Sequence, residues 1–311
     1  LREGFPLLTS TLVYAATNAL PPLVLGAVGT AVDVAMLRAV QPIASLSLAA
    51  SSAFAVLYLP LVARMWHRGD RLGVRLSFWR TALWIALVSY PALLLGTAFA
   101  QPTTVTLLGE RYASSAPILV VCAVGFWFQS ATGFSAQVLS VAGRRRLLLA
   151  ANVGSLLLGV AMAWWLIPRH GAMGAAVAMS VTLIGSNAFR QAALAGLPTR
   201  VVDRQIALPY VAMVLGLVLC VGLQAWLGLG FVPALLVSLV VSLGVAAIAV
   251  PYLDIRSTFP EMLTAPVLGT LIARADRAAD RRHFLGNRNT SDPARHARFA
   301  ALLKAVPELA V

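Results

Sequence analysis

The sequence predicts an all-α, polytopic transmembrane helix bundle, and three observations support this fold class. Of the 311 residues, 59% are hydrophobic and only 11% are charged, whereas a soluble domain carries about 45–50% apolar and about 25% charged residues. The mean hydropathy is +0.84. The apolar residues also form long runs, and a helix needs about 20 such residues to cross a bilayer core. A soluble enzyme is therefore excluded.

Eight helical segments are expected, joined by the short connections that are typical of antiparallel neighbours in a bundle. None of them shows the alternating pattern of a β-barrel strand. They run over residues 6–29, 34–62, 80–100, 116–140, 147–168, 173–196, 207–228 and 231–252.

Every second predicted loop is rich in arginine. These loops hold Arg64, Arg68, Arg71, Arg75 and Arg80; then Arg144, Arg145 and Arg146; then Arg200 and Arg204, with Arg190 just inside the helix end. The opposing loops hold only Arg111 beside Glu110 and Arg169 beside His170. By the positive-inside rule the basic loops face the cytoplasm. We therefore expect a multi-pass protein of the cytoplasmic membrane, with Leu1 and the tail on the cytoplasmic side.

Two regions are predicted, a transmembrane helical lobe over 1–252 and a cytoplasmic basic tail over 253–311. The tail has two amphipathic stretches, 261–284 and 294–306, which suit an anionic membrane surface; a partly disordered, solvated tail is the alternative. Because the sequence starts at Leu1 without an initiator Met, we expect an N-terminal part to precede it. The net charge of +13 lies mostly in loops, where it orients a membrane protein, so no nucleic-acid partner is expected.

No constellation for catalysis or metal binding is visible in the sequence. Asp33 and Asp254 are the acids near a predicted membrane edge, and the four histidines are scattered. There is no carboxylate pair, no His/Cys ligand spacing, no nucleophile elbow and no Walker A motif. We therefore expect no catalytic residue, no metal, no cofactor and no enzyme activity. Cys122 and Cys220 lie in apolar runs and are expected to serve only as packing side chains.

A polar stripe marks the second predicted helix. Arg38, Gln41, Ser45 and Ser52 fall within an arc of about 60° on a helix. The first helix has a similar set, Thr11, Tyr14 and Asn18. An arginine at membrane depth costs at least about 2.5 kcal/mol and normally faces a bundle interior or a watery cavity. The stripes therefore predict a shared hydrophilic lumen, with cargo-binding residues Arg38, Gln41, Ser45, Asn18 and Tyr14.

The alternative interpretation is that Arg38 reaches the outer interface and pairs with Asp33, five residues away. Three further amides, Gln129, Asn152 and Asn187, are expected to form hydrogen bonds between helices. Pro21, Pro22, Pro42 and Pro60 should kink the first two helices, as suits a transporter that rocks between two openings.

Four motifs carry a family resemblance. In chain order they are Pro60 with Arg64, Gly69 and Asp70; Gly109-Glu110-Arg111-Tyr112 followed by Ala116-Pro117-Ile118-Leu119; Gly143-Arg144; and Pro168-Arg169-His170-Gly171-Ala172-Met173-Gly174-Ala175-Ala176. Through these the chain, over about residues 1–252, resembles the C-terminal part of polysaccharide (O-antigen, Wzx-type) flippases of the multidrug/oligosaccharidyl-lipid/polysaccharide exporter superfamily. The resemblance implies a two-lobed transporter with a central cavity, of which this chain supplies the second lobe and two further spans.

The function that this resemblance implies is the flipping of a polyprenyl-diphosphate-linked oligosaccharide for surface polysaccharide assembly. The expected partners are the lipid-linked glycan, membrane lipids, an N-terminal lobe outside this sequence, and a polysaccharide polymerase or glycosyltransferases. A multidrug antiporter and a peptidoglycan-precursor flippase of the same superfamily are the alternatives. A membrane glycan transferase or polymerase is less consistent with the sequence, because the interface acids that it would need are too few.

Overall fold

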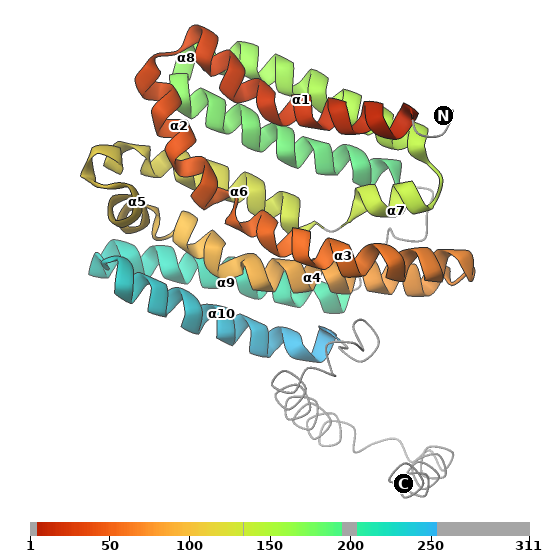
Figure 1. Ribbon diagram of the computed structural model, residues 1–311. Helices are drawn as coiled ribbons and strands as arrows, with labels where there is room; N and C mark the ends of the chain where they lie inside the picture. Colours follow the sequence, from red (N-terminus) through yellow and green to blue (C-terminus); the bar gives the residue numbers. More distant parts are fainter. Residues whose placement is uncertain (1–4, 133, 195–203, 254–311) are drawn as a thin grey trace, which may run out of the picture. The chain divides into compact units, whose positions relative to one another are not determined.

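The computed structural model describes residues 5–132, 134–194 and 204–253, and all secondary structure within them is helical (Figure 1). The predicted all-α bundle is confirmed. Its elements are α1 (Phe5–Val28), α2 (Ala31–Ala44), α3 (Leu46–His67), α4 (Arg71–Gly96), α5 (Ala100–Leu108), a short 3-10 helix η1 (Glu110–Ser115), α6 (Ala116–Ala131), α7 (Ser135–Val141), α8 (Arg145–Ala193), α9 (Arg204–Leu227) and α10 (Phe231–Leu253). The predicted basic tail lies outside the described residues beyond Leu253.

Six segments of the described chain are long and apolar enough to cross a membrane, so this is a multi-pass membrane protein. They are Leu46–His67, Arg71–Gly96, Glu110–Val141, Arg145–Ala193, Ala207–Leu227 and Phe231–Val250. Two of the eight predicted segments fall together in α8, whose 49 residues reverse direction at Gly171 (φ 53°, ψ −129°). The first predicted segment corresponds to α1, in which Ala15–Val28 forms a shorter apolar helix.

Three predicted segments have other boundaries in the structure. The segment predicted over 116–140 contains the end of α6 at Ala131 and the start of α7 at Ser135. The segment predicted over 34–62 consists of two helices, α2 and α3, which meet at Ser45. The third segment begins at Arg71 rather than at residue 80, because the Asp70 carboxylate caps α4 by accepting the Gly73 N–H at 2.8 Å. Arginines 71, 75 and 80 therefore lie on a helix and not in a loop. Charge alone suggested a loop, but a capped helix can continue beyond its apolar part.

The packing places α6 and α4 at the centre of the described bundle. Helix α1 runs along the two limbs of α8, α6 packs against both α8 and α4, and α9 and α10 pair with each other beside α4 (Figure 1). Close contact between α6 and α8 requires a glycine: a Cβ at Gly125 would lie 2.7 Å from the Cα of Ser180. The Ser180 hydroxyl donates to the Val121 carbonyl at 2.7 Å across the same contact. Such small-residue packing is typical of membrane helices.

Two apolar clusters fill the bundle. One joins α1, α2, α6 and α8 around Leu37, Leu119 and Phe126, and the other joins α3, α4, α7 and α8 around Tyr58, whose ring stacks on Phe134 at 4.9 Å. Both cysteines are free and buried, Cys122 on α6 and Cys220 on α9.

Candidate functional site

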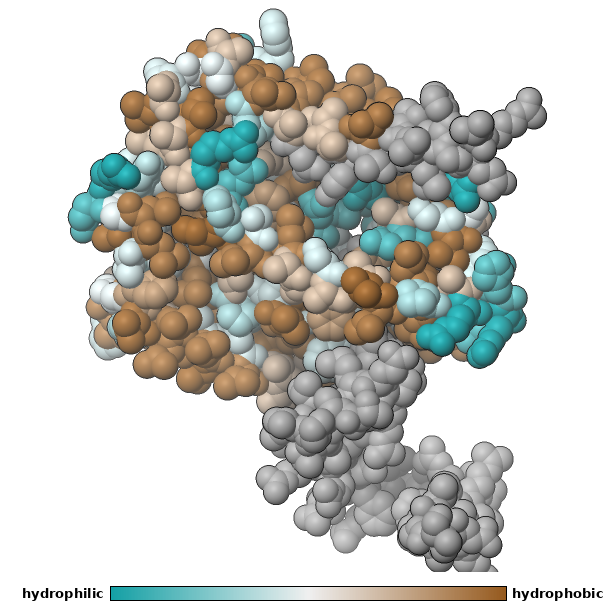
Figure 2. Space-filling view, viewed as in Figure 1, coloured by the Kyte–Doolittle hydropathy of each residue, from teal (hydrophilic) through white to brown (hydrophobic). Residues whose placement is uncertain are grey.

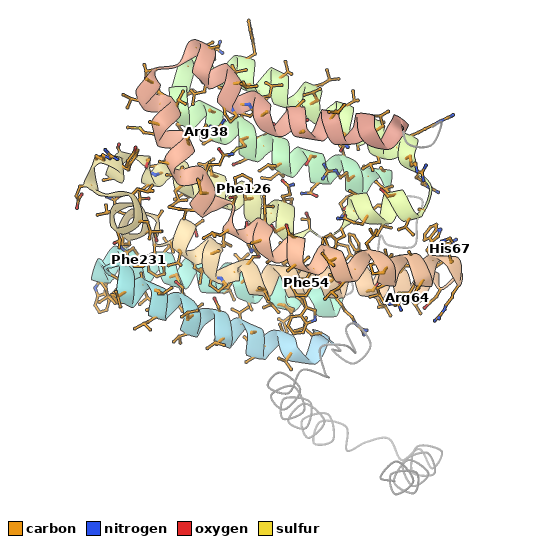
Figure 3. The ribbon with its side chains drawn as sticks, viewed as in Figure 1. Arg38, Phe54, Arg64, His67, Phe126 and Phe231 are labelled. Carbon is orange, nitrogen blue, oxygen red and sulfur yellow. The ribbon has the colours of Figure 1, made fainter. Side chains whose placement is uncertain are left out.

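The Arg38 side chain is exposed on α2 and is oriented by its neighbour one helical turn further on. Its Nη1 donates to Gln41 Oε1 at 3.3 Å. Leu37, Val40 and Ala44 are the buried residues of α2, so helix packing turns Arg38 away from the core (Figure 3). The surrounding surface is apolar: Figure 2 shows a hydrophilic patch over this part of α2 with hydrophobic side chains around it. Arg38 is therefore an exposed cation on an apolar surface. Its place in a hydrophilic lumen, which the polar stripe predicted, stays a prediction.

The helix carrying Arg38 is discontinuous close to that residue. In a regular helix the N–H of residue 42 would donate to the carbonyl of Arg38, but Pro42 has no N–H. At the junction the Ser45 N–H donates to the Gln41 carbonyl at 3.0 Å, and the Ser45 hydroxyl donates to the Pro42 carbonyl at 3.1 Å. Ser52 bonds back to Leu48 in the same way, at 3.0 Å. The hydroxyls of Ser45 and Ser52 thus donate to nearby backbone carbonyls. The side chains of the stripe that can still donate to a ligand are those of Arg38 and Gln41.

The other half of the predicted lumen concerns Thr11, Tyr14 and Asn18. The backbone of α1 is helical here and packs along α8, but these three side chains lie outside what the structure describes. Their role as lumen or cargo-binding residues stays a prediction.

Asp33 does not pair with Arg38. Five residues on a helix correspond to about 140° around the axis, so the two side chains lie on different faces. Instead the Asp33 carboxylate accepts the Thr30 N–H at 3.1 Å and the Thr30 hydroxyl at 2.7 Å, which completes a capping box at the start of α2. It also accepts the Ala172 N–H at 3.3 Å, at the start of the second limb of α8.

These hydrogen bonds determine the titration of Asp33. The bonds from the Thr30 hydroxyl and N–H, helped by the Ala172 N–H and opposed by partial desolvation, hold the pKa of Asp33 below its ordinary value of 3.8. One carboxylate therefore caps two helices from segments that are 139 residues apart.

A buried arginine joins the two limbs of α8. Arg190 is only 7% exposed, and its Nε and Nη2 donate to Asn152 Oδ1 at 3.3 and 3.2 Å. This confirms the interhelical role predicted for Asn152. Asn187 differs, since its amide donates to the Leu183 carbonyl of its own helix at 3.4 Å. In the sequence Arg190 was counted with the charges of the adjoining loop, although it was placed just inside the helix end; its position six residues before the end of the predicted helix was the available signal of burial.

A second amide, that of Gln191, extends this polar layer to α6. Its Nε2 donates to the Thr132 carbonyl at 3.1 Å, directly after α6 ends. Across the described residues, no group of three or more His, Cys, Asp and Glu side chains is placed to hold a metal ion.

The comparisons with known proteins found no match. No family model matches the chain, and neither a curated protein nor a solved structure does. The resemblance to polysaccharide flippases therefore depends on the sequence motifs.

Proposed function

We propose that the protein flips a polyprenyl-diphosphate-linked oligosaccharide across the cytoplasmic membrane for surface polysaccharide assembly. The observation that carries this proposal is the exposed Arg38 guanidinium on an apolar helix surface. A cation in such a place is costly unless it faces water or an anionic ligand. Arginine offers a planar fork of N–H groups that matches phosphate oxygens and stays charged at any depth.

In this proposal Gln41 positions the fork. Its Oε1 holds Nη1 of Arg38, which fixes the plane of the guanidinium while its other N–H groups remain for the diphosphate of the cargo. The polyprenyl chain stays in the lipid, and the diphosphate binds at Arg38 and Gln41 as the sugar crosses, because transfer of these groups through hydrocarbon is the barrier to spontaneous flipping. The break at Pro42 and Ser45 allows α2 to change its angle to α3 when the transporter alternates between openings.

The arginine-rich turns support the orientation in the proposal. The α3–α4 turn and the turn at Gly143 face the cytoplasm, and the α5–α6 connection and the reversal at Gly171 face outward. The tail after Leu253 is cytoplasmic in the same scheme.

Substitution of Arg38 in the full-length protein tests the cargo role. Arg38→Lys keeps the charge but loses the fork, so glycan export per membrane-inserted protein should fall several-fold while protein abundance stays close to that of the wild type. Arg169→Lys is a matched control, since Arg169 is an exposed arginine that bonds the Trp165 carbonyl on α8. Normal export with Arg38→Ala would contradict the cargo role.

A further inference from the structure

Five basic side chains gather around the turn between α3 and α4: Arg64, His67, Arg68, Arg71 and Arg75. Four of them are exposed and Arg75 is half-buried. Figure 3 labels Arg64 and His67 at this end of α3, and Figure 2 shows a strongly hydrophilic patch there. The acid in the turn, Asp70, is engaged in capping α4 through the Gly73 N–H at 2.8 Å. The basic turn, as we call these five residues, therefore carries a concentrated positive charge.

The basic turn lies at a bilayer surface. It joins Leu46–His67 to Arg71–Gly96, two segments that are each long and apolar enough to span the membrane. Beside it the guanidinium of Arg71 lies 3.4 Å from the centre of the Trp66 ring, and tryptophan is typical of the headgroup level. Leu72, next in sequence, is 61% exposed. This placement holds for either orientation of the protein in the membrane.

Helix dipoles stabilise only some of these positive charges. Arg64, His67 and Arg68 lie at the C-terminus of α3, where a cation is favourable. Arg71 is the first residue of α4, at its positive end, where a cation is unfavourable, and Arg75 lies one turn further along the helix. Among the described residues no carboxylate forms an ion pair with these two arginines. Asp70 supplies one carboxylate at the start of α4, so the basic side chains outnumber the acid in this turn and favour a further anion from outside the protein.

An apolar strip leads away from the basic turn along α3. Leu57, Pro60 and Arg64 are exposed at i, i+3 and i+7, so they line one face of the helix. An anion with an acyl chain could place its headgroup at the arginines and its chain along Leu57 and Pro60. An inorganic anion would use the arginines alone.

We propose that the basic turn binds the phosphate headgroup of an anionic phospholipid, such as phosphatidylglycerol or cardiolipin. The guanidinium groups of Arg71 and Arg75 hold the phosphate oxygens, and Arg64 and Arg68 add long-range attraction from the facing helix end. The bound lipid offsets the unfavourable charge at the start of α4 and holds the α3–α4 hairpin at the membrane surface. This site is separate from Arg38 and does not depend on the proposed transport activity.

Titration of the purified full-length protein with lipid tests this site. The protein is kept in a neutral detergent, phosphatidylglycerol or phosphatidylcholine is added in increasing mole fraction, and the shift of the thermal unfolding midpoint gives an apparent affinity. Phosphatidylglycerol should raise the midpoint in a saturable manner, and phosphatidylcholine should have little effect. Arg71→Gln with Arg75→Gln should weaken phosphatidylglycerol binding at least about tenfold, since each arginine near an anionic surface contributes about 1 kcal/mol.

The matched control removes the same charge at two other turns. Arg111→Gln with Arg169→Gln should retain the wild-type affinity. Arg71→Lys with Arg75→Lys keeps the charge and should bind with intermediate affinity, so the test remains decisive if the glutamine variant does not fold. Equal stabilisation by the two lipids, or equal weakening in the Arg71/Arg75 and Arg111/Arg169 glutamine variants, would overturn the proposal. If inorganic pyrophosphate raised the unfolding midpoint and phosphatidylglycerol did not, the site would bind a diphosphate and the lipid proposal would be overturned.

Discussion

At the scale of single residues, Asp33 shows how one carboxylate can determine local structure in two places. It completes the capping box of α2 with Thr30 and also bonds the Ala172 N–H where the second limb of α8 begins. The capping box is local and can be expected from Thr30 and Asp33 at a spacing of three. The bond to the Ala172 N–H cannot be expected from the sequence, because it joins residues that are 139 positions apart and depends on the reversal of α8 at Gly171. That Arg38 and Gln41 share a face could be predicted, because helical spacing determines it; the exposure of that face depends on how α2 packs.

The double role of Asp33 predicts a measurable loss of stability. Asp33→Ala should lower the free energy of unfolding by about 1 kcal/mol or somewhat more, because a helix cap and a second bond to a backbone N–H are lost. Arg38→Ala should cost little, since Arg38 is exposed and its side chain bonds only half-buried Gln41 in the described contacts. Because the two residues do not pair, their effects should add in the double variant. Thermal unfolding in detergent measures the two single variants and the double variant. A double variant whose loss of stability differs strongly from the sum of the two single losses would show that Asp33 and Arg38 interact.

Asp33 also predicts a specific pH dependence. Its pKa is lower in the folded protein than its ordinary value of 3.8. Its contribution to stability is therefore present above that ordinary value and is lost as the pH falls through the folded-state pKa. Unfolding midpoints measured between neutral and strongly acidic pH should fall less steeply for Asp33→Ala than for the wild type in the acidic range. Curves that stay parallel would mean that the Asp33 bonds contribute nothing to stability.

At the scale of elements, backbone breaks determine the arrangement of the helices. The sequence separated the two limbs of α8 correctly at residues 168–173, because glycine and charged residues interrupt the apolar run there. The sequence did not separate α2 from α3, since Pro42 and Ser45 lie in a stretch, 39–62, that contains neither a glycine nor a charged residue. It also missed the first turns of α4, where Asp70 starts the helix among arginines. Apolar length predicts a span, whereas caps determine where a helix begins.

Gly171 is a position at this scale where a substitution should disturb the arrangement of the helices. Its φ of 53° is rarely adopted by other residues, and a Cβ there would lie 2.9 Å from Asp33 Oδ1. Gly171→Ala should therefore lower the free energy of unfolding by about 1–3 kcal/mol. Gly222→Ala on α9 is the matched control, since its Cβ would meet no atom within 4 Å and alanine favours a helix. Thermal unfolding of both variants tests this; equal midpoints would show that the reversal tolerates a side chain.

At the scale of the whole molecule, composition and apolar run length are sufficient to predict a multi-pass helical protein, because they reflect the bilayer itself. They do not determine which helices meet. The buried contact of Arg190 with Asn152 and the central position of α4 depend on packing between distant segments. Polar stripes were predicted from spacing on both α1 and α2, and their role in binding cargo stays a prediction.

The orientation of the whole molecule follows from its arginine-rich turns. We expect residues 66–78, 143–146, 197–206 and 253–311 to be cytoplasmic. Cysteine at His67 or Arg146, both exposed, should react with an impermeant thiol reagent only after the cells are opened, whereas cysteine at Arg111 or Gly230 should react in intact cells.

Gly73 is unsuitable as a labelling site, because a Cβ there would collide with the Asp70 carboxylate. The unsubstituted protein is the blank, since Cys122 and Cys220 are buried. Labelling of position 67 in intact cells would invert the orientation.

Reconstitution tests most directly whether the protein flips a diphosphate-linked glycan across the membrane and whether Arg38 binds the diphosphate during transfer. The full-length protein is placed in liposomes with a polyprenyl-diphosphate oligosaccharide, and transfer between leaflets is followed by the access of an external glycan-cleaving enzyme. Transfer should be faster than in protein-free liposomes, should fall several-fold with Arg38→Lys and should be unchanged with Arg169→Lys. Transfer at the protein-free rate, or transfer that Arg38→Ala leaves unchanged, would contradict this proposal.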